Sequence, residues 1–461
     1  MRESVQKPVR PEVGLKRDLG PWSAAAIVVG TVIGSGIFLV PKDMIDAVGS
    51  PWMVLVVWVA GGLLSLGGAL TYAELAAALP EAGGEYVFLR EAYGPFWGFL
   101  FGWAQMWVGK SGSVATLATA FYIYLANFQP GLEAVIVSIP LPVGPEGGPL
   151  ELRWGQLLAI AVILLLASVN YFGVRFGGRI QVAVTLVKLG LIFAILAIGL
   201  GSEQGSGANF SSAIAVPGGA AGFFVALVAA LWAYDGWNNV SMVSSEIRNP
   251  QRSLPLALIA GTLTVATVYL LANLAYFYVL SADKVAADNR VAANMMGQIL
   301  GDWGKNAVSI AAMVSIFAAL NGSILSGARV PYAMARDGLF FRPVSRVHPT
   351  YHTPGVSILA LSCWATVLVL SGRYKQLYTL VIFANWLFYG LTTASILVLR
   401  RKRPDLARPY RTLGYPVLPF LFVLGAASVI FFTLRDSPRE SLLALALILV
   451  GIPFYFLRKR R

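Results

Sequence analysis

Long apolar stretches recur along the chain, separated by short polar connections. The hydrocarbon core of a bilayer is about 30 Å thick and is crossed by about 20 helical residues. By this measure the pattern predicts twelve membrane-spanning helices, at residues 21–47, 51–79, 95–127, 152–171, 178–200, 219–244, 254–280, 304–334, 355–371, 376–399, 413–434 and 440–457. The short alternating segments of outer-membrane barrels are not apparent. The sequence therefore predicts an all-α polytopic membrane protein.

Composition agrees with lipid as the solvent. Hydrophobic residues make up 57% of the chain and charged residues only 12%, with a mean hydropathy of +0.70. Soluble domains carry about 25% charged residues. Residues 1–20 are polar and contain no apolar core of a cleavable signal peptide. We therefore expect a polar tail there, with the first span acting as an uncleaved signal.

Lysine and arginine gather in alternate connections between the predicted spans. If the N-terminus is cytosolic, the cytosolic side holds most of the 35 basic residues, including those at 400–403 and 458–461. Cytosolic connections are enriched in these residues, so we expect both termini in the cytosol of a protein of the cell membrane. The net charge of +13 follows from this bias and from attraction to anionic headgroups. No stretch is long enough for a folded basic domain that would bind nucleic acid.

Two predicted spans are interrupted near their middle by small or polar residues. The first contains Gly34, Ser35 and Gly36, and the sixth contains the run from Asp235 to Asn239. Three weak helix formers in one turn cost about 2–3 kcal/mol relative to alanine, and unpaired backbone groups in lipid cost more. The small residues of the first span either form a close-packing face for another helix or mark a break that lines a cavity.

The position of the two interruptions favours breaks. Each falls 12–16 residues into its span, and the two spans cross the membrane in opposite directions, five spans apart. Interrupted helices at matching positions of oppositely oriented units are typical of inverted-repeat transporters. We therefore predict one repeat at residues 21–200, a second at 219–400, and two peripheral helices at 413–457.

Three segments resemble signatures of a known family. They are GTVIGSGIF (residues 30–38), TYAELAAALPEAGGEYVFLREAYGP (71–95) and the region from AYDGWNNV to SSEIRNPQRSLPLAL (233–258). They are similar to the amino acid–polyamine–organocation superfamily, nearest its L-type amino acid transporter branch. The resemblance implies a leucine-transporter-type fold with discontinuous helices 1 and 6, and amino acid transport by alternating access without a cofactor.

A zwitterionic amino acid needs one site for its carboxylate and one for its ammonium group. The half-helix beginning near Ser35, Gly36 and Ile37 offers unpaired N–H groups and a partial positive charge. The half-helices before the breaks end in carbonyl groups near Val32 and Ile33, and near Trp232 and Ala233. The resemblance implies carboxylate contacts at Ser35 and Gly36, and amine contacts at Val32, Trp232, Ala233 and Asp235.

The sixth span leaves three side chains with two interpretations each. Trp232 either closes over the substrate, as the resemblance implies, or is an ordinary packed aromatic. Asn238 either faces the substrate or caps the second half-helix. Asp235 either extends acceptance toward cationic amino acids or caps that half-helix, because a carboxylate at membrane depth is costly unless it faces a cavity.

Lys188 lies about 12 Å into the bilayer, counted from Ile180. Ionisable residues at this depth are candidates for function. In the resembled branch a lysine of span 5 occupies the place of a sodium ion, which implies contacts with carbonyl groups near Ile33 and with Ser323. Transport would then be sodium-independent. The alternative is a structural lysine paired with a buried acid.

Other charged residues give weaker signals. The role of Lys110 is not derivable, and salt bridges of Glu74, Glu85 and Glu246 with Arg90, Arg248 or Arg329 would form an inner gate, although such charges are more often solvated. His348 and His352 lack a third ligand, so no metal site is expected. No sequence motif of an enzyme appears.

The sequence leaves the transport mode open. Exchange of neutral and cationic amino acids is favoured, proton-coupled symport is the alternative, and an amino-acid-gated sensor or channel is less favoured. The single cysteine, Cys363, lies inside a predicted span. Animal relatives are attached to a glycoprotein heavy chain through a cysteine in the loop at 127–153, and this loop has none, so we expect no disulfide-linked heavy chain.

Overall fold

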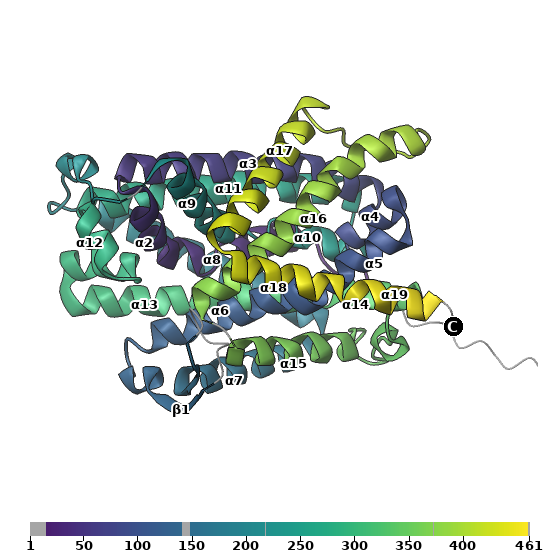
Figure 1. Ribbon diagram of the computed structural model, residues 1–461, viewed down its shortest axis with the longest axis horizontal. Coiled ribbons are helices and arrows are strands. Elements are labelled where there is room, and N and C mark those ends of the chain that lie inside the picture. The colour runs from purple at the N-terminus through teal and green to yellow at the C-terminus, as the bar shows by residue number, and fades with distance from the viewer. Residues whose placement is uncertain (1–14, 141–147, 217, 372, 460–461) are drawn as a thin grey trace, which may run out of the picture.

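The structure is a computed structural model that describes residues 15–140, 148–216, 218–371 and 373–459. Helices dominate it, and most of the long ones run along the long axis of the molecule (Figure 1). Within the described residues, nine helical segments are long and apolar enough to cross a membrane. Each predicted span coincides over most of its length with one or more helices, although residues 152 and 153 belong to strand β2 and residues 413–416 to the turn before α17. The protein is therefore a helical, multi-pass membrane protein.

Two of the predicted spans before residue 201 consist of more than one helical element: α1 and α2 in the first span, and α5, η1 and α6 in the third. Five of the α-helices among the described residues begin with proline, whose missing N–H group costs no hydrogen bond at this position. The elements are α1 (Pro21–Val32), α2 (Gly36–Val48), α3 (Pro51–Ala78), α4 (Glu85–Tyr93), α5 (Pro95–Ala104), η1 (Gln105–Gly109), α6 (Lys110–Leu125), η2 (Pro130–Glu133), β1 (Val135–Ile139), β2 (Leu150–Arg153), α7 (Trp154–Tyr171) and α8 (Val174–Leu200).

The second half repeats the interruption and then adds peripheral helices. Its elements are η4 (Gly207–Ser211), α9 (Gly219–Tyr234), α10 (Asn239–Met242), η5 (Ser244–Glu246), α11 (Pro250–Val279), α12 (Ala282–Ala287), α13 (Val291–Gly327), α14 (Arg329–Arg336), η6 (Arg342–Ser345), α15 (Gly355–Ser371), α16 (Tyr374–Lys402), α17 (Val417–Asp436), α18 (Pro438–Leu449) and α19 (Gly451–Lys459).

The eighth span begins close to the position that the apolar pattern predicted. The sequence indicated 304–334, and the element labelled α13 is interrupted at Gly301, whose φ of 64° and ψ of −155° are not helical. Only glycine adopts such a φ readily. The turns before this kink carry Asn294 and Gln298 and form a separate helix, and the apolar spanning helix starts directly after it.

The first span lies at the centre of the molecule. Its most apolar window is 89% buried, compared with 28% for α17 and 22% for the segment of α18 and α19. α1 packs against α8, α11 and α13, and α2 packs against α9. The interrupted helices are therefore surrounded by protein, where irregular backbone is tolerated, whereas the last two predicted spans lie at the periphery.

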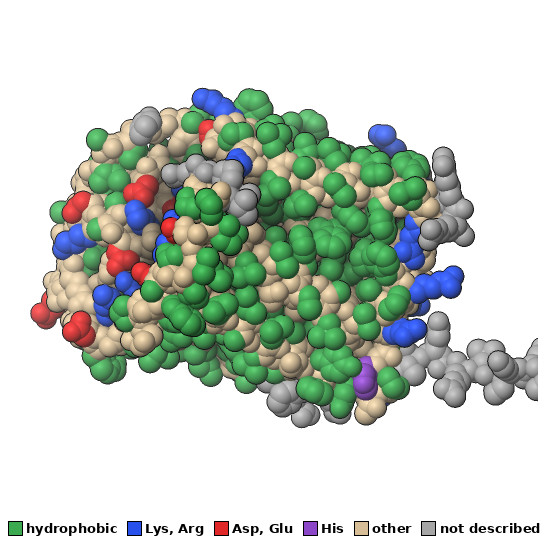
Figure 2. Space-filling view, turned by 60° about the horizontal axis from the view of Figure 1, so that its bottom comes forward, with side chains coloured by type: hydrophobic (Ala, Val, Ile, Leu, Met, Phe, Trp, Pro, Cys, Tyr) green, Lys and Arg blue, Asp and Glu red, His purple; other side chains and the backbone are tan. Residues whose placement is uncertain are grey.

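The two ends of the molecule differ in charge. The antiparallel hairpin of β1 and β2 and helix α12 lie at one end, and α14 and α19 lie at the other (Figure 1). On the face drawn in Figure 2, the left end carries acidic and basic side chains together and the right end carries basic ones. Hydrophobic side chains cover the band between the ends, as expected for a lipid-facing surface.

Candidate functional site

The first break opens the N-terminus of a half-helix inside the protein. α1 ends at Val32 and α2 begins at Gly36, as the small residues of this span predicted. No backbone acceptor is described for the N–H groups of Gly36 and Ile37. A β-carbon added to Gly36 would lie 2.4 Å from Cα and Cβ of Ala233. Glycine therefore permits the two interrupted helices to touch while two donors stay free.

The second break faces the first. α9 ends at Tyr234 and α10 begins at Asn239, and Gly236 between them has a φ of 107°. The hydroxyl group of Thr31 in α1 lies 3.1 Å from the carbonyl oxygen of Gly236. The same hydroxyl group lies 2.6 Å from the carbonyl oxygen of Ile27 in its own helix. The last turn of α1 therefore packs directly against the second break, in addition to the contact at Gly36.

A small cavity lies between the two breaks. Its volume is about 20 Å³, enough for about one water molecule. It is lined by Thr31, Val32, Gly34, Ser35, Gly36, Ser113, Leu117, Trp232, Asp235, Gly236, Asn239 and Ser323. Seven of the predicted site residues therefore meet in one place, whereas Ile33, Ile37, Ala233, Asn238 and Lys188 do not line this space.

The carbonyl groups at the ends of α1 and α9 already accept hydrogen bonds. The hydroxyl oxygen of Tyr269 in α11 lies 2.8 Å from the carbonyl oxygens of both Val32 and Ala233. The N–H group of Asp235 donates to the carbonyl of Trp232 at 3.1 Å. The sequence analysis did not single out Tyr269, because α11 contains three tyrosines and its sequence does not distinguish which of them faces the breaks.

Lys188 extends from α8 to the end of α1. Its Nζ lies 2.7 Å from the carbonyl oxygen of Gly30 and 2.6 Å from that of Ile33, and the residue is fully buried. Within the described residues Lys188 has no ion pair with an acid, which argues against the alternative of a structural lysine bound to a carboxylate.

The predicted partner of Lys188 in α13 was wrong. The hydroxyl group that shares the Ile33 carbonyl belongs to Ser315, at 2.9 Å. Ser323 has no described hydrogen bond to Lys188 and lines the cavity instead. Ser315 precedes Ser323 by about two helical turns, and the apolar pattern of α13 did not fix how deeply each turn lies against α1.

Asn238 does not line the cavity, and it occupies the N-cap position of α10 without a capping hydrogen bond from its side chain. Its amide donates to Glu85, and its amide oxygen lies 3.2 Å from the hydroxyl oxygen of Tyr389. The neighbouring Asn239 lines the cavity and accepts a hydrogen bond from Lys110. An unwound segment has no helical period, so the sequence could not indicate which of two adjacent asparagines turns inward.

Asp235 lies at the cavity with its carboxylate already held. Oδ1 accepts from the hydroxyl group of Tyr389 at 2.7 Å and from the amide of Asn385 at 3.3 Å, both in α16. The predicted alternative role as helix cap is not seen, because the residue preceding α10 is Asn238. The carboxylate is therefore oriented by α16, and one face of it borders the cavity.

Two charge clusters lie beyond the breaks, toward the end of the molecule with α14. Arg329 and Glu246 form a two-pronged ion pair, with distances of 2.7 and 3.1 Å, and each side chain is 1% exposed. This is one of the inner-gate pairs predicted from sequence. Arg90 pairs instead with Asp337, and Arg248 with Asp18.

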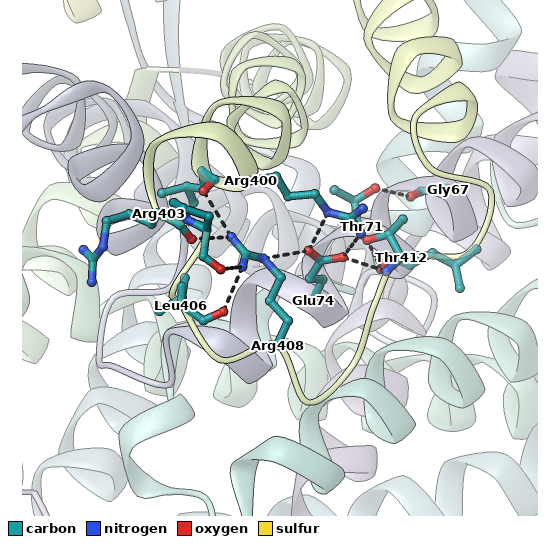
Figure 3. A network of polar contacts seen from close by, with 11 residues as sticks. Gly67, Thr71, Glu74, Arg400, Arg403, Leu406, Arg408 and Thr412 are labelled. Carbon is teal, nitrogen blue, oxygen red and sulfur yellow. Dashed lines mark hydrogen bonds and ion pairs between the residues drawn. The ribbon is translucent and has the colours of Figure 1, made fainter.

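Glu74 belongs to the second cluster, which Figure 3 shows from close by. Its carboxylate accepts from Arg400 at 3.0 and 2.7 Å and from the N–H group of Thr412 at 2.7 Å, and it lies 3.4 Å from Arg408. The arginines belong to the end of α16 and the following connection. Glu74 therefore pairs with Arg400 and Arg408 and not with the arginines predicted from sequence. These ion pairs attach the connection after α16 to α3.

The two histidines lie in the connection between η6 and α15. His348 stacks on Tyr351 with ring centroids 4.4 Å apart. No group of three or more metal-ligating side chains occurs among the residues that the structure describes. The site is therefore built from backbone groups, hydroxyl groups, an amide and a carboxylate, which can bind and release a small zwitterion but present no nucleophile with an adjacent base.

Known proteins resemble the chain over its full length. A family described as amino acid permease matches residues 19–453. The chain is 32% identical to the serine/threonine exchanger SteT of Bacillus subtilis, over 97% of this chain and 98% of that protein. It is 33% identical to the human b(0,+)-type amino acid transporter 1, over 99% and 90% respectively. It is 30% identical to the human cystine/glutamate transporter, over 98% and 87%. The chain therefore belongs to the amino acid permease family of the amino acid–polyamine–organocation superfamily, and it is an amino acid transporter rather than an enzyme.

Proposed function

We propose that this protein is a sodium-independent exchanger of amino acids that works by alternating access. The fold would be of the leucine-transporter type with twelve spans, in which residues 21–200 and 219–400 are inverted repeats. Both termini would lie in the cytosol, and no disulfide-linked heavy chain would be needed. The contact of Lys188 with the end of α1 is the observation that carries the proposal most directly.

The substrate's carboxylate would bind at the start of α2. The free N–H groups of Gly36 and Ile37 and the hydroxyl group of Ser35 surround this position. A helix N-terminus carries a partial positive charge of about half an elementary charge. An anionic group therefore finds donors and a favourable field there without any charged side chain.

The substrate's ammonium group would bind the carbonyl groups at the ends of α1 and α9. Tyr269 already contacts those of Val32 and Ala233, and the N–H group of Gly34 donates to that of Val32 at 2.7 Å. A carbonyl oxygen has two lone pairs, and the hydroxyl group of Tyr269 has one proton, so the carbonyl of Ala233 can accept a further donor. The carboxylate of Asp235 borders the same space. The ammonium and carboxylate sites would thus both lie at the breaks.

Lys188 explains why sodium would not be required. A sodium ion at this place would be held by carbonyl groups of α1 and hydroxyl groups of α13. The ammonium group of Lys188 donates to the carbonyl oxygens of Gly30 and Ile33, and the hydroxyl group of Ser315 donates to that of Ile33. A fixed positive charge therefore already occupies the position, and a metal cation would be repelled from it.

The side-chain preference would be set by Asp235. Its carboxylate is oriented by Tyr389 and Asn385 and remains at the cavity. We expect neutral amino acids to be accepted, and cationic ones to gain from this negative charge. Asp235→Gly tests the idea, because uptake of arginine relative to alanine should fall; an unchanged ratio would exclude the role.

The cavity as it stands is too small for any amino acid. Substrate entry therefore requires the elements around the breaks to separate, which is what alternating access provides. The present arrangement corresponds to a state in which the two broken helices have closed on each other.

Purified protein in liposomes tests the proposal. Radiolabelled amino acid should enter vesicles only when the lumen contains unlabelled amino acid, with equal rates in sodium and choline buffers. Uptake into empty vesicles that scales with an imposed pH gradient would establish proton-coupled symport instead. A sodium requirement would refute the role of Lys188, and non-saturating uptake without counterflow would indicate a channel.

A further inference from the structure

Tyr374 connects both broken helices to a third element. It begins α16, and its hydroxyl group lies 3.0 Å from Oγ of Ser35. Nε1 of Trp232 lies 2.8 Å from the same hydroxyl oxygen. Because an indole nitrogen only donates, Trp232 donates to Tyr374, and Tyr374 donates to Ser35. One hydroxyl group therefore links the start of α2, the end of α9 and the start of α16.

Tyr374 also stands between two spaces. A vestibule of about 390 Å³ lies at the end of the molecule that carries the hairpin, and Tyr374 and Tyr122 are among its lining residues. Ser35 and Trp232, the two partners of the Tyr374 hydroxyl group, line the small cavity between the breaks. The hydrogen-bonded chain thus joins a residue that lines the vestibule to two residues that line the small cavity.

Neighbouring contacts hold the same turn of α16 in place. The hydroxyl group of Tyr378 donates to Asp43 of α2 at 2.8 Å, and Lys375 lies 3.9 Å from that carboxylate. The ring of Tyr378 stacks on Trp232 with centroids 6.0 Å apart. The first turns of α16 are therefore attached to both broken helices. These contacts must break before the vestibule and the cavity can become continuous.

We propose that Tyr374 is the outer gate of the substrate cavity, a positioning residue whose hydroxyl group closes the vestibule side by joining Ser35 to Trp232. The inference rests on the proposed binding site between the breaks. It does not depend on the identity of the substrate or on exchange. A tyrosine that is merely packed would stabilise the protein equally toward both sides of the membrane, whereas a gate acts on one side.

Cysteine accessibility separates these two roles. The reporter is Ser113→Cys, which lines the cavity, in a Cys363→Ser background that removes the single native cysteine. A membrane-impermeant cationic methanethiosulfonate reagent is applied to intact cells or to inverted vesicles. Labelling requires no turnover, so it remains informative even if the proposed transport function fails.

Tyr374→Phe should speed labelling from the vestibule side about tenfold, because loss of two hydrogen bonds between neutral groups is worth about 1.4 kcal/mol. Labelling from the other side should stay at the wild-type rate. Tyr122→Phe is the matched control, since it removes a vestibule tyrosine whose hydroxyl group has no described hydrogen bond, and it should label like wild type.

Ser35→Ala provides a second variant that keeps the ring and the Trp232 contact, and it should give a smaller acceleration on the same side. Equal rates in Tyr374→Phe and Tyr122→Phe would overturn the gate. So would an acceleration from both sides, which would indicate general loosening. If labelling changes as expected but no variant or wild-type protein transports amino acids, the gate stands and the proposed function fails.

Discussion

The contact at Gly36 makes a quantitative prediction about the broken helices. Replacing Gly36 by alanine places a β-carbon 2.4 Å from both Cα and Cβ of Ala233. Ordinary carbon contacts lie near 3.5 Å, so α2 and α9 must move apart by about 1 Å. Because Cα of Ala233 belongs to the backbone, no rotation of a side chain can relieve the overlap.

The energetic cost follows from known overpacking effects. One added methyl group in a well-packed interior costs about 1–3 kcal/mol, and a displacement of about 1 Å at a functional site lowers rates by about 100-fold. We therefore expect Gly36→Ala to fold with reduced stability and to lose about 99% of exchange activity. The free N–H groups of α2 would be displaced from the end of α9.

Two other glycines calibrate the measurement. At Gly34 the added carbon would lie 3.0 Å from Cδ2 of Leu117 and 3.1 Å from Cβ of Ala319, and the leucine can move. At Gly190 nothing lies within 4 Å, so alanine should raise the stability by about 0.5–1 kcal/mol. Initial exchange rates should thus fall in the order Gly190→Ala, Gly34→Ala, Gly36→Ala.

The assay combines exchange into liposomes with thermal unfolding in detergent. Equal loss of activity in all three variants would mean that glycine is needed for another reason than close approach. Exchange by Gly36→Ala at more than half the wild-type rate would refute the argument that this contact positions the site.

Three further predictions concern buried charges. Lys188→Met should reduce the exchange rate in liposomes to less than about a tenth of the wild-type rate. The Gly30 carbonyl loses its donor, whereas the Ile33 carbonyl keeps the hydroxyl group of Ser315. An exchange rate equal to that of the wild type would contradict the proposed role of Lys188. Glu246→Gln should lower the unfolding free energy by about 3–5 kcal/mol, because it leaves a fully buried arginine without a counter-charge. Glu74→Gln should cost less, as its arginine partners are 23% and 11% exposed and can be hydrated; thermal unfolding in which Glu74→Gln is the more damaging variant would reverse this order.

Much of the architecture could be predicted because its causes are local. An apolar stretch of sufficient length must cross the bilayer as a helix, since lipid offers no partner for its backbone. Small and polar residues at 34–36 and 235–239 interrupt such stretches, and the structure ends helices there. The depth of Lys188 followed from counting residues along α8, whereas its contact with the Ile33 carbonyl was implied by the family resemblance.

What only the tertiary structure decided was which side chains converge on the breaks. Ser315 rather than Ser323 shares the Ile33 carbonyl, Asn239 rather than Asn238 lines the cavity, and Tyr374 joins residues that are over a hundred positions away. The apolar pattern of one segment reports its length and its contact with lipid. It carries no information on the axial shift or rotation of one buried helix against another, and an unwound segment has no period at all, so these partners are set by packing across the whole molecule.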